Sequence, residues 1–397
     1  MRMLDFMDLW IHLKIVFVCD YYSPHIGGAE LVYKRYCEGL AKRGHSVRVI
    51  TIKHSKGVPN QELINGVEIQ RINTFRNSRY LFILFSIRKI FMYVKDADIV
   101  HCAFFMSPFS SFPAAKLWNK PLVVTVHEVW GRMWFRFEKD ILRALFNYLG
   151  ERLLTNIPYD VITCCSIFTF NSLRILGVRE GAIIYIPNGV DFEFFKPRIK
   201  EAKLKRELNL DGSKVYMYYG RPGISKGVRV LIKAAALIKK RINNSKLLLI
   251  LDREPIKEYK NIINLINKLN LWDHIRLLDP VPREDLPRHI ALADLVVVPS
   301  LSEGFGFTAV EAGAMEKPVV ATYAGSLPEV VSNRDSGLLV KPNSVSDLYE
   351  AICSLLENED EALQMGRIGR GLITKFDWNK SIDSIEKLYE KLLDEFL

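Results

Sequence analysis

The chain has 397 residues, 49% of them hydrophobic, which predicts a folded protein of two ordinary-sized domains and excludes a mainly disordered chain. Its formal net charge of +10 lies mostly in residues 1–190, which carry 24 Lys and Arg against 15 Asp and Glu. This surplus suits an anionic membrane surface or phosphorylated small molecules, while the lack of a long basic block or nucleic-acid-binding motif argues against nucleic acid.

The six cysteines have no CxxC pairs and no metal-like spacing, which indicates small buried residues in a reducing compartment. Arg88 and Lys89 interrupt residues 80–94, so no apolar run reaches the roughly 18 to 20 residues of a membrane-spanning helix. The first residues, MRMLDFMDLWIHLK, carry acids where a signal peptide carries bases. We therefore expect a cytoplasmic protein, with peripheral contact at the inner face of the cell membrane as an open alternative.

An apolar run of strand length, KIVFVCD, opens the first half. A glycine pair, Gly27 and Gly28, then precedes an amphipathic helix that ends at Gly44. Apolar runs of similar length recur with helical patterns between them, which predicts a doubly wound parallel sheet covered on both faces. The further strands are expected at 46–52, 67–72, 98–102, 121–127, 160–166 and 182–188.

Ligands of such sheets bind outside the carboxyl ends of the strands. Gly27 and Gly28 would offer backbone N–H groups and a helix N-terminus to an anion there, although a plain turn explains them at least as well. His127 ends its strand and is followed by Glu128, so a structural role and a site role are equally favoured. His101 has a similar location with weaker support.

An acidic pair, Asp96 and Asp98, is of the kind that can hold a divalent metal. The pair precedes a strand and therefore lies at its amino end, away from the expected ligand edge. A helix-to-strand turn explains both acids. We predict neither a metal site nor a cofactor.

Two segments mix aromatic residues with Arg and Lys, at 79–95 and 130–139. The favoured interpretation is a core-packed helix with a solvated basic face. Contact with a membrane surface is the alternative, and it would place a lipid-linked substrate beside the basic first domain.

Residues 187–197 concentrate proline and glycine and mark the joint between domains. We predict one domain at 1–190, a second at 191–376 and a closing amphipathic helix at 377–397 that could cap the second domain. The second half repeats the alternation of strands and helices. Its strands are expected at 214–220, 246–252, 275–279, 294–300, 318–322 and 336–340.

The first turn of the second domain, GRPGISKG, places Arg221 and Lys226 at a strand's carboxyl end, before a helix beginning near Gly227. Arg binds phosphate oxygens bidentately and Lys supplies a mobile charge, so the pair could hold a diphosphate without a metal. The spacing differs from that of a Walker loop. Two solvated bases in an exposed turn are the alternative.

The segment at 299–329, PSLSEGFGFTAVEAGAMEKPVVATYAGSLPE, carries two carboxylates eight residues apart. Glu303 lies in a glycine-containing loop, and Glu311 follows about two turns later inside a helix. Both acids could therefore face one cleft. A polar turn with one solvated acid is the competing interpretation, and spacing alone does not separate the two.

Taken together, the motifs HIGGAE, TVHE, IPNGVD, GRPGISKG and the long segment PSLSEGFGFTAVEAGAMEKPVVATYAGSLPEVV resemble the retaining glycosyltransferases of the group-1 class, family 4. The resemblance covers the chain from about Lys14 onward. It implies the GT-B fold, in which two Rossmann-like doubly wound domains face a cleft. It also implies metal-independent transfer of a sugar from a nucleotide diphosphate sugar to a hydroxyl, with the closing helix crossing back to the first domain.

The resemblance also implies roles for individual residues. Arg221 and Lys226 would bind the donor's diphosphate, and Glu303 would lie next to the transferred sugar. Glu311 would bind the ribose. The remaining implied positions are His127 near the sugar, Gly27 and Gly28 beside the phosphates and the acceptor, and the backbone amides of Gly304, Phe305, Gly306 and Phe307 against sugar hydroxyls and phosphate.

One departure concerns the loop at 252–254, which reads Asp-Arg-Glu where relatives often have a glycine-rich turn, so the nucleobase is left open. A glycan, a lipid-linked molecule or a small molecule could be the acceptor. Two other functions share the fold class: a sugar-nucleotide epimerase, and a non-catalytic partner that binds sugar nucleotides or an anionic membrane.

Overall fold

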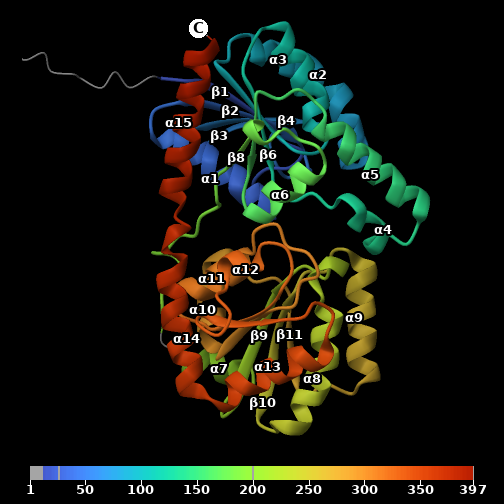
Figure 1. Cartoon of the computed structure of the whole chain (residues 1–397), viewed down its shortest axis with the longest axis vertical. Coiled ribbons are helices and arrows are strands. Elements are labelled where there is room, and N and C mark those ends of the chain that lie inside the picture. The colour runs from blue at the N-terminus through green and yellow to red at the C-terminus, as the bar shows by residue number, and fades with distance from the viewer. Residues whose placement is uncertain (1–11, 26, 199–200, 397) are drawn as a thin grey trace, which may run out of the picture.

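The computed structural model describes residues 12–25, 27–198 and 201–396, so most of the acidic N-terminal segment considered above lies outside the described residues. The chain forms two α/β units, each built on a largely parallel sheet, and Figure 1 shows them stacked along the long axis of the molecule. In the described part of the chain, no helix is long and apolar enough to cross a membrane. All six cysteines are buried and free.

The first unit contains an eight-stranded sheet in the order β3-β4-β2-β1-β5-β6-β7-β8. Its central strands are buried along their whole length, as continuous apolar runs require. Sequence analysis missed β3, a short edge strand antiparallel to β4 whose side chains alternate between exposed and half-buried. The strands are β1 (Lys14–Val18), β2 (Ser46–Ile52), β3 (Gln61–Ile64), β4 (Val67–Ile72), β5 (Ile99–Ala103), β6 (Leu122–Val126), β7 (Val161–Cys164) and β8 (Ile183–Tyr185).

Helices cover both faces of this sheet, with α2 and α3 packed on one face and α1 on the other. The segment at 130–139 does not form the expected core-packed helix, because it breaks into a 3₁₀ turn and a four-residue helix. The helices are α1 (Gly28–Lys42), α2 (Arg79–Lys95), α3 (Ser107–Leu117), α4 (Trp134–Phe137), α5 (Ile141–Thr155) and α6 (Ile167–Ile175), with 3₁₀ turns η1 (Phe75–Asn77), η2 (Gly131–Met133) and η3 (Glu180–Ala182).

The second unit contains a parallel six-stranded sheet in the order β11-β10-β9-β12-β13-β14. Helices α10 and α11 pack on one face, and α8, α9 and α13 on the other. The strands are β9 (Lys214–Gly220), β10 (Ser245–Leu251), β11 (Ile275–Leu278), β12 (Leu295–Val298), β13 (Val319–Thr322) and β14 (Gly337–Val340). The helices are α7 (Ala202–Glu207), α8 (Val228–Arg241), α9 (Ile256–Lys268), α10 (Leu286–Leu292), α11 (Phe307–Ala314), α12 (Leu327–Val330), α13 (Val345–Glu357) and α14 (Glu359–Leu372), with 3₁₀ turns η4 (Ile224–Lys226), η5 (Arg283–Asp285) and η6 (Ile373–Lys375).

The closing helix α15 (Trp378–Phe396) leaves the second unit and lies along α1 of the first (Figure 1). Its apolar face joins the core of the first sheet through Ile382, Ile385 and Tyr389. The Tyr389 hydroxyl also lies 2.5 Å from Nδ1 of buried His101, whose Nε2 lies 2.6 Å from the Thr125 hydroxyl. His101 is therefore a structural residue that fastens α15 to the first sheet.

Candidate active site

The carboxyl ends of β9 and β12 bring two of the predicted site residues into contact. Lys226 ends the turn η4 after β9, and Glu303 lies in the loop between β12 and α11. The Lys226 Nζ atom lies 2.8 and 3.1 Å from the two carboxylate oxygens of Glu303. The Ser300 hydroxyl donates to the same carboxylate at 3.0 Å. The pair is mostly buried, with side chains 27% and 15% exposed, so it forms a well-held ion pair at the ligand edge of the sheet.

The glycines around this pair allow backbone segments to approach closely. Gly227 has φ of +66°, and a Cβ atom there would clash with the Pro299 carbonyl. Gly306 precedes α11 with φ of +88°, a backbone conformation that residues other than glycine rarely adopt. A Cβ atom at Gly304 would clash with the carbonyl oxygen of His127 in the first unit. The loop after β12 thus meets the first unit backbone to backbone.

His127 occupies the first-unit side of this contact, directly after β6. Its Nε2 atom lies 3.1 Å from the Tyr33 hydroxyl of α1. Burial lowers the pKa of His127 to about 4, so the imidazole is neutral at pH 7. Its carbonyl oxygen accepts hydrogen bonds from Cys165 Sγ at 3.3 Å and Thr169 Oγ1 at 3.1 Å. The structure therefore places His127 and Gly304 on opposite sides of one interface.

Glu128 is a functional candidate that sequence reasoning did not select. Its carboxylate accepts a hydrogen bond from the Ser302 hydroxyl, across the two units. Burial raises the pKa of Glu128, and the negative charge of Glu303 adds to this effect while Lys226 opposes it. The only signal in the sequence was its position next to His127 at a strand end.

Glu311 faces a different part of the second unit. It is buried in α11, and its carboxylate accepts hydrogen bonds from Arg283 at 2.9 Å and from the Tyr219 hydroxyl at 3.1 Å. Burial raises the pKa of Tyr219, and the Glu311 charge raises it further. The sequence did not single out Arg283 either, although it follows strand β11 and other candidates were chosen because they follow a strand. Glu311 with Arg283 and Tyr219 therefore forms one cluster, and Lys226 with Glu303 forms another. The loop after β12 and helix α11 connect the two clusters.

The glycine pair lies at the start of α1, on the first-unit side of the contact between the units. Gly27 is the N-terminal cap in extended conformation and has no side-chain capping bond, and Gly28 lies against the ring of Phe307. Burial acts to raise the pKa of nearby Glu30, but the His25 imidazole, whose Nδ1 lies 3.3 Å from the Glu30 carboxylate, and the charge of Arg221 bring the pKa below its ordinary value. The N-terminus of α1 therefore faces the second unit.

Arg221, Phe305 and Asp98, which the sequence analysis also considered, have side chains in three different environments. Arg221 is exposed, and in the described part of the chain its guanidinium has no ion-pair or hydrogen-bond partner. The Phe305 side chain is buried in the core against Phe376, so only its backbone could meet a ligand. Asp98 accepts a hydrogen bond from the Lys14 amide at 2.7 Å, which is the turn role expected for the acidic pair.

The unusual loop after β10 is tied to its neighbour. The Arg253 guanidinium forms two hydrogen bonds of 2.8 and 2.9 Å with Asp279, which follows β11. The backbone amide of Glu254 donates to Asp252 at 3.1 Å. The loop is therefore charged and largely exposed at this edge of the sheet.

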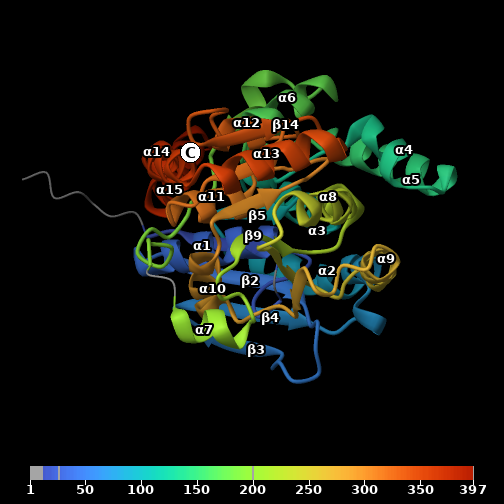
Figure 2. The same cartoon turned by 90° about the horizontal axis from the view of Figure 1, so that it is seen from below.

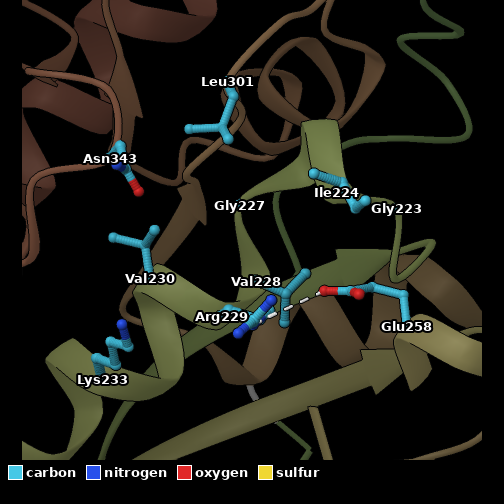
Figure 3. A pocket seen from close by; sticks show the side chains of 10 residues that line it. All are labelled: Gly223, Ile224, Gly227, Val228, Arg229, Val230, Lys233, Glu258, Leu301 and Asn343. Atoms are coloured by element: carbon cyan, nitrogen blue, oxygen red, sulfur yellow. Dashed lines mark ion pairs between the residues drawn. The ribbon is translucent and has the colours of Figure 1, made fainter. Parts of the chain in front are cut away.

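A hollow of about 290 Å³ lies against the turn that carries Lys226 (Figure 3). Arg229 and Lys233 line it, and Arg229 lies 3.9 Å from Glu258. None of the predicted site side chains lines this hollow. The contact between Gly304 and His127 instead lies where the two units meet, and Glu303, the residue before Gly304, pairs with Lys226 there.

Both units of the chain are similar in sequence to known protein families. Residues 26–194 match Glycosyltransferase Family 4, and residues 200–372 match Glycosyl transferases group 1. An uncharacterized glycosyltransferase of Methanocaldococcus jannaschii is 31% identical over 97% of this chain and 100% of its own length. The D-inositol 3-phosphate glycosyltransferase of Corynebacterium jeikeium is 34% identical over 53% of this chain and 52% of its own length.

Solved structures share the fold. Sucrose-phosphate synthase from Thermosynechococcus elongatus has a TM-score of 0.85 and 23% identity, covering 96% of this chain and 100% of that one. HepE of Anabaena, in complex with UDP-glucose, has a TM-score of 0.80 and 21% identity with the same coverage. The predicted GT-B fold is confirmed. The chain belongs to the group 1, family 4 glycosyltransferases and is a retaining enzyme that transfers a sugar from a nucleotide sugar to an acceptor.

Proposed function

We propose that the donor binds between the two units, at the edge where Lys226 and Glu303 meet, and that Arg221 and Lys226 hold its diphosphate. The Lys226–Glu303 ion pair, 2.8 Å long and facing the His127 interface, is the observation that supports this most directly. Arg221 is exposed on the same turn as Lys226, and in the described residues its guanidinium forms no ion pair or hydrogen bond, so it is free to bind an anion.

In the proposed reaction, Lys226 leaves Glu303 for the diphosphate, and Glu303 accepts hydrogen bonds from hydroxyls of the transferred sugar. The bond between the anomeric carbon and the phosphate oxygen breaks, so negative charge develops on the diphosphate. Fixed cations and the amides of the loop at 304–307 stabilise that charge in the transition state. The acceptor oxygen then bonds to the same face of the anomeric carbon, and its proton passes to the departing phosphate.

The neutral state of His127 suits a role as a hydrogen-bonding group near the sugar, because a pKa of about 4 leaves no proton to donate as an imidazolium at pH 7. Glu311 is proposed to bind the ribose, with Arg283 orienting its carboxylate. A UDP-sugar is the first donor to test, since HepE, which shares the fold, binds UDP-glucose.

For the acceptor, we propose a hydroxyl of a glycan, a lipid-linked molecule or a small molecule, reached from the first unit. The positive charge of residues 1–190 supports a location on the cytoplasmic side of a membrane, in peripheral contact with anionic lipid.

Release of nucleoside diphosphate tests the proposal. The protein is incubated with UDP-, GDP- and ADP-sugars, with and without candidate acceptors, and the released diphosphate and the anomeric configuration of any product are determined. Release of one diphosphate, lost in Lys226→Ala, is the expected result. A free epimerised sugar formed without acceptor would indicate an epimerase, and no release from any donor would indicate a non-catalytic binding protein.

A further inference from the structure

Helix α5 carries its apolar face toward the outside of the molecule. Six large apolar side chains on this helix are between 42% and 75% exposed. Their spacing of one helical turn places them in a single stripe along the helix. They form the α5 stripe, which consists of Ile141, Leu142, Leu145, Phe146, Leu149 and Leu153.

Polar anchors hold the helix in this orientation. The buried carboxylate of Glu151, on the opposite side of α5, accepts hydrogen bonds from the backbone amides of Trp130 at 2.8 Å and Gly131 at 2.5 Å. Ala144 and Leu154 are buried on the same inner side. Rotating α5 to bury the stripe would turn Glu151 toward solvent and leave the backbone amides of Trp130 and Gly131 without this hydrogen-bond partner. The outward stripe is therefore a stable feature of the fold.

Exposed bases lie on α5 and on the segment that leads into it, and together they are called the rim of the stripe. Residues 130–155 contribute Arg132, Arg136, Lys139, Arg143 and Arg152, all of which are exposed. The same residues, 130–155, contain two acids that are exposed or half-exposed, Glu138 and Asp140. The Glu138 carboxylate lies 3.3 Å from the Arg143 guanidinium. Asp140 caps α5 by accepting hydrogen bonds from two backbone amides. The surface thus combines an apolar stripe with a positively charged rim, as interfacial helices do.

We propose that the α5 stripe inserts into the surface of an anionic lipid bilayer and docks the enzyme there. This inference rests on the proposed function, since a membrane-bound enzyme could reach a lipid-linked acceptor. Figure 1 and Figure 2 both show α4 and α5 projecting from the first unit, so the stripe lies on a protruding ridge that a flat bilayer can reach.

A second copy of the chain fits this surface less well than lipid does. Pairing two α5 stripes would bring two positively charged rims together, and like charges across an interface oppose association. Anionic headgroups complement the same rim, and each base near such a surface strengthens binding about fivefold. The charge of the rim therefore selects the bilayer over self-association.

Vesicle binding by the full chain tests the inference. A variant with Leu142→Glu, Phe146→Glu and Leu149→Glu is compared with a control carrying Leu63→Glu, Ile175→Glu and Leu363→Glu, which adds the same charge at exposed apolar sites elsewhere. The probes are phosphatidylcholine vesicles with and without phosphatidylglycerol, at low and high ionic strength. Each variant is also assayed for mass in solution and for diphosphate release without vesicles.

We expect wild type and control to bind the anionic vesicles at low ionic strength, and the α5 variant to bind at least about tenfold more weakly. Equal binding by the α5 variant, or no binding by wild type, would overturn the inference. Conversion of a dimer to a monomer by the α5 variant, with vesicle binding unchanged, would assign the stripe to self-association. If wild type released no diphosphate, the proposed function would be refuted, whereas the vesicle-binding result would still test membrane docking.

Discussion

Replacing Lys226 with alanine removes the ammonium group that lies 2.8 Å from Glu303. Among the described residues of the folded variant, the Ser300 hydroxyl at 3.0 Å would be the one hydrogen-bond donor left to the Glu303 carboxylate, so we expect a loss of about 1 to 2 kcal/mol in the free energy of unfolding. In the proposed reaction, the same ammonium group stabilises charge on the leaving diphosphate. By analogy with the loss of one oxyanion donor, transition-state stabilisation should fall by about 2 to 4 kcal/mol.

That loss corresponds to a decrease of about 30- to 1,000-fold in kcat/KM for diphosphate release. Initial rates are measured at limiting donor concentration, and urea unfolding measures stability in parallel. Lys233→Ala is the matched control, because Lys233 is an exposed lysine on α8, the helix that follows the Lys226 turn. If Lys226→Ala kept kcat/KM within about threefold of wild type while folded, Lys226 could not be holding the diphosphate.

Four further predictions concern other contacts. Gly304→Ala should fold but lose at least about tenfold in kcat, because its Cβ would clash with the His127 carbonyl; wild-type turnover would show that this contact is dispensable. Arg283→Ala should raise the donor KM by roughly tenfold with kcat retained, and an unchanged KM would separate Glu311 from donor binding. Tyr389→Phe should destabilise the protein by about 1 to 2 kcal/mol in urea unfolding, with no effect expected if α15 is held by apolar packing alone. Folding holds His127 neutral with a pKa of about 4, so its contribution to stability is present above pH 6.5 and is lost as pH falls toward 4. His127→Asn should therefore reduce the slope of the free energy of unfolding against pH, between pH 4 and 6.5, by up to about 1.4 kcal/mol per pH unit. An identical slope in wild type and variant would show that His127 titrates normally.

Most of the strands could be predicted because a parallel sheet covered on both faces needs continuous apolar runs, which are visible in the sequence. Strand β3 lacks such a run, since it lies at an edge and is stabilised by pairing with β4. Helix α5 could not be oriented from periodicity, because a stripe of leucines predicts a buried face and the structure turns that face outward.

Within the site, the motifs identified the loops but not their partners. Lys226 and Glu303 are 77 residues apart, and the sequence offered each a separate role rather than an ion pair. The contacts of Glu128 with Ser302 and of Gly304 with His127 arise where the two units meet. Such contacts depend on the packing of whole domains, which no local pattern encodes.

The proposed function requires Arg221 and Lys226 to hold a nucleoside diphosphate between the two units. Binding is measured by calorimetric titration of UDP, GDP and ADP into wild type and into the double variant Arg221→Ala, Lys226→Ala. One diphosphate should bind wild type, and it should bind the double variant at least about 100-fold more weakly, as two lost charge-assisted contacts imply. Equal affinity for the two proteins would show that Arg221 and Lys226 do not hold the diphosphate.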